Sequence, residues 1–233
     1  MVRYGVVKDK IQREIVLLKG NPCVWGKCTF CDYTDDNIFG DLSEALRVNH
    51  AALSLVSGIY GRLEVVNSGS VFELPNETLE LIHKVSSEKN IHALYFEASW
   101  MYRSKIRALR QEFERQELFF KCGVETFDDD FRNNVMLKGI YIDHPRDIAE
   151  YFDSVCLLVG MLGQTREMVK RDIDILTTYF KMGCVNIFME NSTNIKADYD
   201  LIGWFKDTYG RMEDYPGIDC LWENTDFDVG SSN

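Results

Sequence analysis

Short apolar runs alternate with longer amphipathic segments along the chain, a pattern typical of repeated strand–helix units. The predicted strands cover residues 14–19, 63–66, 91–96, 118–124, 154–159 and 185–189, with a last strand at 218–222. Amphipathic spacing predicts helices at 43–59, 77–88, 104–115, 165–181 and 198–209, and two short helices near 128–135 and 145–151.

Six strand–helix units fill most of the 233 residues, whereas a closed eight-stranded barrel typically takes ~250. We therefore predict an α/β fold, a partial open (β/α)6 barrel, with a doubly wound open sheet as the alternative. The expected single domain has an N-terminal extension (1–13), a barrel core (14–212) and a C-terminal segment (213–233) that closes the barrel mouth. In either fold, ligands gather at the carboxyl ends of the strands.

Composition and charge indicate which kinds of molecule the protein can bind. The chain has 26 basic and 37 acidic residues and a formal charge of −11, which disfavours a nucleic-acid surface. No apolar run approaches the ~20 residues of a membrane span. Residues 1–10 lack the apolar region of a secretory signal. We expect a cytoplasmic protein that acts on a small molecule, with no nucleic-acid and no membrane partner.

Seven cysteines cannot all pair in internal disulfides, because the number is odd. Three of them, Cys23, Cys28 and Cys31, lie within nine residues. Three thiolates suit a [4Fe–4S] cluster that keeps one iron open for another ligand. A structural zinc ion completed by His50 or Asp32 is the alternative. The spacing by itself leaves both open.

The other four cysteines are isolated in apolar stretches. We predict that they are small core residues. They are Cys122, Cys156, Cys184 and Cys220.

The loop that carries the three cysteines follows the first predicted strand, and Phe30 precedes the last of them. This arrangement resembles the radical S-adenosylmethionine (radical SAM) superfamily. The usual motif spaces its cysteines three and two residues apart; here the first gap is four residues, and Gly26 allows the longer loop to bend. The resemblance implies a [4Fe–4S] loop bound by Cys23, Cys28 and Cys31, with S-adenosylmethionine as the second cofactor.

The resemblance continues along the strands. Residues 67–70 stand in the place of the superfamily's Gly-Gly-Glu-like segment without its glutamate, 121–126 resemble its ribose-contacting segment, and 159–165 resemble its Gly-x-x-Gly-Gln-Thr turn. Helix capping and turn formation are the alternative roles for these residues. The cofactor-binding residues implied by the resemblance are Phe30, Ser68, Gly69, Glu97, Glu125, Lys138 and Gly160.

The superfamily's chemistry implies a mechanism. A reduced cluster cleaves S-adenosylmethionine, and the resulting 5′-deoxyadenosyl radical abstracts a hydrogen atom from the substrate. An electron donor such as a flavodoxin or a ferredoxin is the implied partner. The sequence singles out no catalytic side chain.

Aromatic and acidic residues near the C-terminus are suited to a flat heterocycle. Aromatic rings stack on such a ring, and carboxylates accept hydrogen bonds from the paired N–H donors of a guanine-like edge. The predicted substrate-binding residues are Glu190, Asn191, Trp222, Asn224, Asp226, Phe227 and Asp228.

The small size, the loop at 22–31 and the ending at 222–230 together resemble the queuine lyase group of radical SAM enzymes. This resemblance implies a lyase of queuosine salvage that cleaves queuine to 7-aminomethyl-7-deazaguanine. The alternatives are another small radical SAM enzyme, acting on a tetrapyrrole or a peptide, and a non-catalytic zinc-binding scaffold protein.

Metal content separates a radical SAM enzyme from a zinc-binding scaffold protein. Protein purified without oxygen should be brown and contain about four irons per chain, because three cysteine ligands imply one cubane cluster. Replacing Cys23, Cys28 and Cys31 together by Ala should give colourless protein. Stoichiometric zinc in colourless wild-type protein would instead favour the scaffold.

Overall fold

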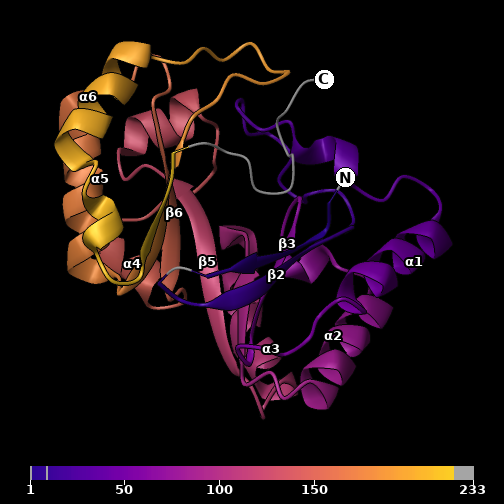
Figure 1. The fold of residues 1–233 in the computed structure, drawn as a ribbon. Helices are drawn as coiled ribbons and strands as arrows, with labels where there is room; N and C mark the ends of the chain where they lie inside the picture. Colours follow the sequence, from indigo (N-terminus) through magenta and orange to yellow (C-terminus); the bar gives the residue numbers. More distant parts are fainter. Residues whose placement is uncertain (1, 9, 223–233) are drawn as a thin grey trace. The chain divides into compact units, whose positions relative to one another are not determined.

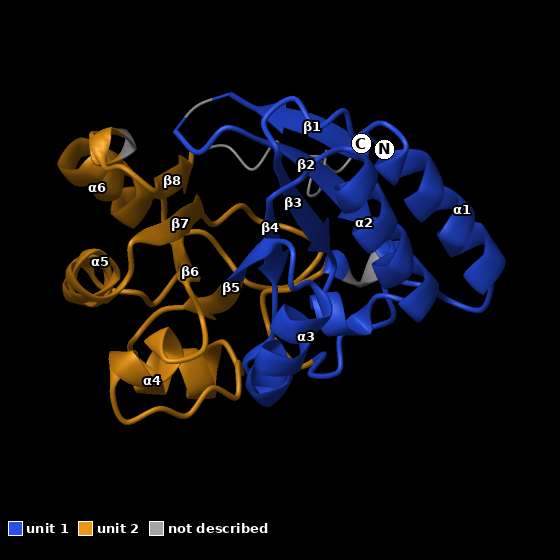
Figure 2. Cartoon of the chain, turned by 90° about the horizontal axis from the view of Figure 1, so that it is seen from below, with its two compact units in different colours: residues 1–26, 33–120 blue, residues 27–32, 121–233 orange. Residues whose placement is uncertain are grey.

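The computed structural model describes residues 2–8 and 10–222, apart from the side chains of residues 34, 35 and 213. The chain divides into two compact units (Figure 2). Unit 1 comprises residues 1–26 and 33–120, and unit 2 comprises residues 27–32 and 121–233. Strands are paired in chain order, from β1 to β8. Figure 1 shows β2 beside β3 in unit 1 and β5 beside β6 in unit 2.

Unit 1 contains the first four strands and their helices. Strand β1 (Tyr4–Val7) pairs antiparallel with β2 (Arg13–Leu18), and β2, β3 (Arg62–Asn67) and β4 (Ala93–Glu97) are parallel. The helices are α1 (Leu42–Leu53), α2 (Asn76–Glu88) and α3 (Ile106–Glu112), with 3-10 turns at Tyr33–Asp36, Val71–Glu73 and Trp100–Lys105.

Unit 2 contains the later strands. Strand β5 (Glu117–Glu125) crosses from unit 1, and its second half pairs parallel with β6 (Ser154–Val159); β7 (Met182–Ile187) and β8 (Ile218–Leu221) continue in parallel. The helices are α4 (Pro145–Ala149), α5 (Arg166–Tyr179) and α6 (Tyr199–Tyr209), with a π-helical turn at Phe131–Val135 and a 3-10 turn at Met212–Asp214.

The sequential strand order confirms the predicted α/β class and the partial (β/α) barrel topology. A doubly wound sheet, the alternative, reverses its strand order at a switch point, and this chain does not. The N-terminal extension adds a strand, β1, that the sequence pattern did not predict. None of the described helices is long and apolar enough to cross a membrane.

The first predicted helix was misplaced at both ends. Asp41, not Ser43, is the N-cap, because its side chain accepts hydrogen bonds from the first-turn amides. The helix ends at Leu53 instead of residue 59. Beyond it, the backbone N–H groups of Ser57 and Gly58 donate to the fully buried carboxylate of Glu14, so a tertiary contact replaces helix continuation.

Other predicted boundaries shift by smaller amounts. Strand β7 starts at Met182, three residues before the prediction, because Gly183 pairs with both β6 and β8. The helix predicted at 104–115 divides into the 3-10 turn at Trp100–Lys105 and the shorter α3.

Two of the four isolated cysteines are not fully buried. Cys122 and Cys184 are core residues, as predicted, but Cys156 and Cys220 are partly exposed. Side chains alternate between the two faces of a strand, and the sequence does not show which face is covered.

A buried carboxylate of α5 is hydrogen-bonded to the backbone just after β5. Asp172 accepts a hydrogen bond of 2.7 Å from the backbone N–H of Phe127. Burial raises the pKa of Asp172 to about 6 from its ordinary 3.8, although hydrogen bonds from Thr126 and Phe127 partly oppose the rise. A pKa raised by folding means that the protonated carboxyl favours the folded state.

The stability contribution of Asp172 should therefore be present below about pH 4 and lost as the pH rises through about 6. Relative to Asp172→Asn, the free energy of unfolding of the wild type should fall by roughly 3 kcal/mol over this window. Urea unfolding of both proteins at the two ends of the window measures the difference. A difference that does not depend on pH would contradict the assignment.

Candidate functional site

The three clustered cysteines lie in the loop after β2 and are partly buried. Cys23 belongs to unit 1, whereas Cys28 and Cys31 belong to unit 2. In unit 2 the backbone N–H of Cys31 donates to the carbonyl of Cys28, which closes a short turn between them. Among the described residues, no group of three or more His, Cys, Asp or Glu side chains is arranged to hold a metal ion. The ligand assignment therefore rests on the spacing of the cysteines and their thiolate chemistry, which fits an iron–sulfur cluster.

A buried carboxylate, Glu73, holds the start of the cysteine loop in unit 1. Its Oε1 accepts from the backbone N–H of Val24 at 2.6 Å, and its Oε2 accepts from the N–H of Ser70 at 2.7 Å. The backbone carbonyl of Glu73 also accepts from the backbone and side-chain amides of Asn21. Burial raises the pKa of Glu73, and the hydrogen bonds from Val24 and Ser70 partly oppose this rise.

The carboxylate of Glu73 leaves no room for a side chain at Gly69. A Cβ at this position would collide with Glu73 Oε2 and would also lie 3.5 Å from the Cα of Cys23. The predicted cofactor segment 67–70 is thus packed between β3 and the cysteine loop. Sequence analysis missed Glu73, although the spacing Ser70-x-x-Glu73 is that of a capping box, and the structure shows both of its hydrogen bonds.

The other two predicted cofactor residues of unit 1 lie at strand ends. Ser68 directly follows β3, and its hydroxyl donates to Oδ1 of Asn37. Glu97 is the last residue of β4 and is partly exposed. Both positions are at the carboxyl edge of the parallel strands, where ligands bind in such folds.

In unit 2 the second half of the cysteine loop packs on an apolar cluster. Phe30 is part of it, and Cys28 and Cys31 pack against it. The N–H of Thr29 donates to the carbonyl of Met136, which fixes the loop on the segment after the π-helical turn. The other members of the cluster are Phe131, Met136, Leu158, Met161 and Phe188.

Lys138 and Glu125 form an ion pair beside this loop. Lys138 Nζ lies 3.0 Å from Glu125 Oε1, with side-chain exposures of 14% and 11%, and 5.6 Å from the centre of the Phe30 ring. Burial alone would lower the pKa of Lys138, but Glu125 and Cys28 raise it above its ordinary value, so the ammonium stays charged. Such a cation stabilises a neighbouring thiolate.

Glu125 reaches this position through an irregular strand end. Its φ is +67°, and the register with β6 shifts between Gly123 and Glu125. A non-glycine residue in this region is uncommon and indicates a local constraint. Glu125 and Lys138, which the sequence analysis predicted as separate cofactor contacts, are therefore in direct contact.

Asn191 holds the cysteine loop. Its Nδ2 donates to the carbonyl of Phe30 at 2.8 Å and to Oδ1 of Asp32 at 3.1 Å. Asp32 Oδ2 also accepts from the backbone and hydroxyl of Ser192. Because Asp32 already accepts these hydrogen bonds, it is a poor candidate for the fourth zinc ligand. Glu190, the neighbouring predicted residue, pairs with Lys196 at 2.8 Å.

Gly160 has the geometry of a tight turn. Its φ is +105°, and a Cβ would collide with Ile202 of α6. The Oε1 of Gln164 accepts from the N–H groups of Gly160 and Met161, and its Nε2 donates to the carbonyl of Leu158. These contacts explain the Gly-x-x-Gly-Gln pattern by turn formation, the alternative role considered from the sequence.

The predicted substrate residues near the C-terminus are only partly described. The ring of Trp222 lies 5.7 Å from that of the buried Phe205 in α6. Asn224, Asp226, Phe227 and Asp228 lie outside the described residues.

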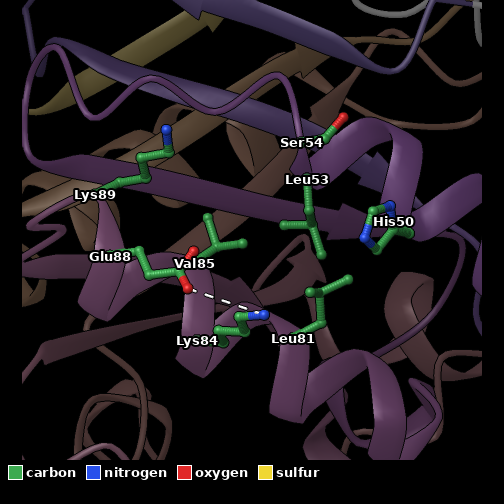
Figure 3. Close-up of a pocket in the computed structure, with 8 residues that line it drawn as sticks. All are labelled: His50, Leu53, Ser54, Leu81, Lys84, Val85, Glu88 and Lys89. Carbon is green, nitrogen blue, oxygen red and sulfur yellow. Dashed lines mark ion pairs between the residues drawn. The ribbon is translucent and has the colours of Figure 1, made fainter.

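A shallow hollow on unit 1 lies between α1 and α2 (Figure 3). Its lining comes from the C-terminal halves of both helices and includes His50, the other zinc candidate, and the ion pair of Lys84 with Glu88 at 3.9 Å. In strand–helix units these helix ends lie at the amino edge of the strands. The hollow is therefore at the opposite edge from Ser68 and Glu97.

Comparison with solved structures shows similarity over the whole chain to a queuine lyase from Clostridium spiroforme bound to SAM and queuine, with 50% sequence identity and a TM-score of 0.95. The match covers 99% of this chain and 100% of that one. No protein-family model and no curated protein matches.

The Glu73 contact can be tested by Glu73→Gln, which keeps the shape of the side chain but replaces an acceptor with a donor. We expect a loss of roughly 1–3 kcal/mol in unfolding free energy, because a buried N–H would lose its partner. Iron should also be lost faster to a chelator. Thermal unfolding and chelation kinetics measure both, and the exposed Glu88→Gln serves as control. Wild-type behaviour of Glu73→Gln in both assays would refute the anchoring role.

Proposed function

The chain belongs to the queuine lyases, which are radical SAM enzymes, and from this membership we propose that it cleaves queuine to 7-aminomethyl-7-deazaguanine. The observation that carries the proposal is 50% identity over essentially the full length of both chains. Identity at this level over essentially the full length of both chains supports a shared activity, whereas fold alone would not define one.

The cofactors are a [4Fe–4S] cluster and S-adenosylmethionine, which together supply a 5′-deoxyadenosyl radical for hydrogen abstraction from the substrate. We assign the cluster to Cys23, Cys28 and Cys31. The spacing of the three thiols in one loop supports the assignment, as does the ammonium of Lys138, whose pKa is raised in part by Cys28.

We assign Lys138 to the carboxylate of S-adenosylmethionine and Glu125 to its ribose. A buried, charged ammonium is a strong partner for a carboxylate, and hydrogen bonds between charged groups are roughly twice as strong as neutral ones. The Lys138–Glu125 pair supports this role, because it orients both groups before the cofactor binds. Ser68, Gly69 and Glu97 are assigned to the same cofactor from their places at the carboxyl ends of β3 and β4.

Phe30 is assigned to the wall beside the cofactor, since its ring lies under the Lys138 ammonium. Gly160 is assigned to the same cofactor from its place in the turn after β6. The proposed substrate contacts remain Glu190, Asn191, Trp222, Asn224, Asp226, Phe227 and Asp228.

The chemistry needs one electron from outside the chain. We propose a small electron carrier, a flavodoxin or a ferredoxin, in the cytoplasm, with no nucleic-acid or membrane partner. The net charge of −11 and the small-molecule substrate support the absence of a nucleic-acid partner.

The function is tested by turnover without oxygen. Reconstituted protein with S-adenosylmethionine, dithionite and queuine should form 7-aminomethyl-7-deazaguanine, detected by mass spectrometry. The variant with Cys23, Cys28 and Cys31 replaced by Ala should form none. Iron-loaded wild type that cleaves S-adenosylmethionine but leaves queuine intact would overturn the proposed substrate and keep the radical chemistry.

The cofactor assignment is tested by Lys138→Met. We expect the dissociation constant of S-adenosylmethionine to rise about tenfold or more, because a charged hydrogen bond is lost. Iron content should be unchanged. The control is Lys196→Met, which removes an exposed ammonium that also pairs with a carboxylate. Equal affinity in the two variants, measured by calorimetry, would leave Lys138 with a purely structural role.

A further inference from the structure

The strands of unit 2 have one face that α5 does not cover. On the covered face, a Cβ at Gly183 would collide with Leu176 of α5. Figure 2 shows α4, α5 and α6 along one side of β5–β8. The other face carries Leu158 and Phe188 of the apolar cluster that contacts Cys28 and Cys31. We call this second face the inner face.

The strand register places four residues in one row across the inner face. Gly123 pairs with Cys156, Cys156 with Cys184, and Cys184 with Asp219, so one row crosses four strands. Cys156 lies two residues before Leu158, which places it on the same face. Core strands of this kind are normally apolar on both faces. Two thiols and a carboxylate in this row depart from that pattern. Either a bound ligand or a packing contact must account for them.

The Glu125–Lys138 pair covers one end of this row. A Cβ at Gly123 would lie 2.7 Å from Glu125 Oε1 and 3.4 Å from Lys138 Nζ. Glycine at this point lets both charged groups lie over the strand. The row thus continues directly from the residues that we assign to S-adenosylmethionine.

In the middle of this row, the carboxamide of Asn186 is hydrogen-bonded to two thiols. Cys184 Sγ donates to Asn186 Oδ1 at 2.9 Å, and Asn186 Nδ2 donates to Cys156 Sγ at 3.2 Å. The hydrogen bond with Cys184, followed by burial, raises the pKa of the Cys156 thiol well above its ordinary value, so this thiol stays neutral. The hydrogen bonds with the two thiols fix the plane of the amide.

Asn186 retains capacity for further hydrogen bonds. A carboxamide has two N–H donors and two acceptor lone pairs, and the thiols use one of each. Within residues 2–8 and 10–222, no other partner of this side chain is found. The residue is partly exposed although it lies within β7 between buried neighbours. Its amide therefore presents one donor and one acceptor on the inner face.

We propose that Asn186 binds the lactam edge of the deazaguanine ring of queuine, a step that rests on the proposed function. A lactam presents an N–H beside a C=O, and a carboxamide matches both with two hydrogen bonds. Asn186 Oδ1 accepts from N1–H and Nδ2 donates to O6. A carboxylate lacks the donor and does not match this edge. Asn186 is thus a specificity residue for the oxo group of the base.

The test measures queuine binding by calorimetry in the presence of S-adenosylmethionine and without reductant, so that no turnover occurs. Asn186→Leu keeps the branched shape and the number of side-chain heavy atoms and removes the hydrogen-bonding groups. We expect its affinity for queuine to fall about tenfold or more, with iron content and S-adenosylmethionine affinity unchanged. Cys220→Ser, on the adjacent strand and in register with Val185, changes the opposite face and should bind queuine like the wild type.

A second measurement uses the wild type alone, in case Asn186→Leu does not fold. Queuine methylated at N1 loses the lactam N–H and should bind about tenfold or more weakly. Wild-type affinity of Asn186→Leu, or of wild-type protein for the methylated base, would overturn the role of Asn186. Failure of the unmodified wild type to bind queuine would overturn the proposed function, and the lactam assignment with it.

Discussion

The hydrogen bond from Val24 to the buried carboxylate of Glu73 is the contact on which the site depends. It fixes the backbone next to Cys23, and its cost in desolvation is offset only because Ser70 and the turn after β3 satisfy the same carboxylate. The requirement for glycine at position 69 follows directly from it. A cofactor segment and a cysteine loop, distant in sequence, are thereby built as one piece within unit 1.

In unit 2, other interactions hold the second half of the cysteine loop in place. Asn191 and Met136 hold the loop between Cys28 and Cys31 through backbone hydrogen bonds, and Phe30 anchors it in an apolar cluster. The charged pair of Lys138 and Glu125 lies beside this apolar surface. Glu125 and Cys28 keep the ammonium protonated, although burial opposes this. The inner face then continues from this charged pair to two thiols and a single amide.

The sequence predicted what depends on local pattern. Parallel strands in chain order follow from apolar periodicity, and the three cysteines with Phe30 follow from a short motif. Glu73 was missed because its contact with Val24 spans 49 residues, and only its capping-box spacing with Ser70 was visible. Asn186 was missed because a lone amide within an apolar strand gives no sign of which face it occupies. Strand β1 has four residues, too few for a clear alternation.

The most direct test of this account is a crystal structure of the reconstituted protein, grown without oxygen, with S-adenosylmethionine and queuine. We predict iron ligated by the thiolates of Cys23, Cys28 and Cys31 at about 2.3 Å, the distance usual for metal–thiolate bonds. The fourth iron should have no protein ligand, and Asn186 should contact the lactam of the base. A fourth protein ligand to the metal, or zinc in place of the cluster, would contradict the account.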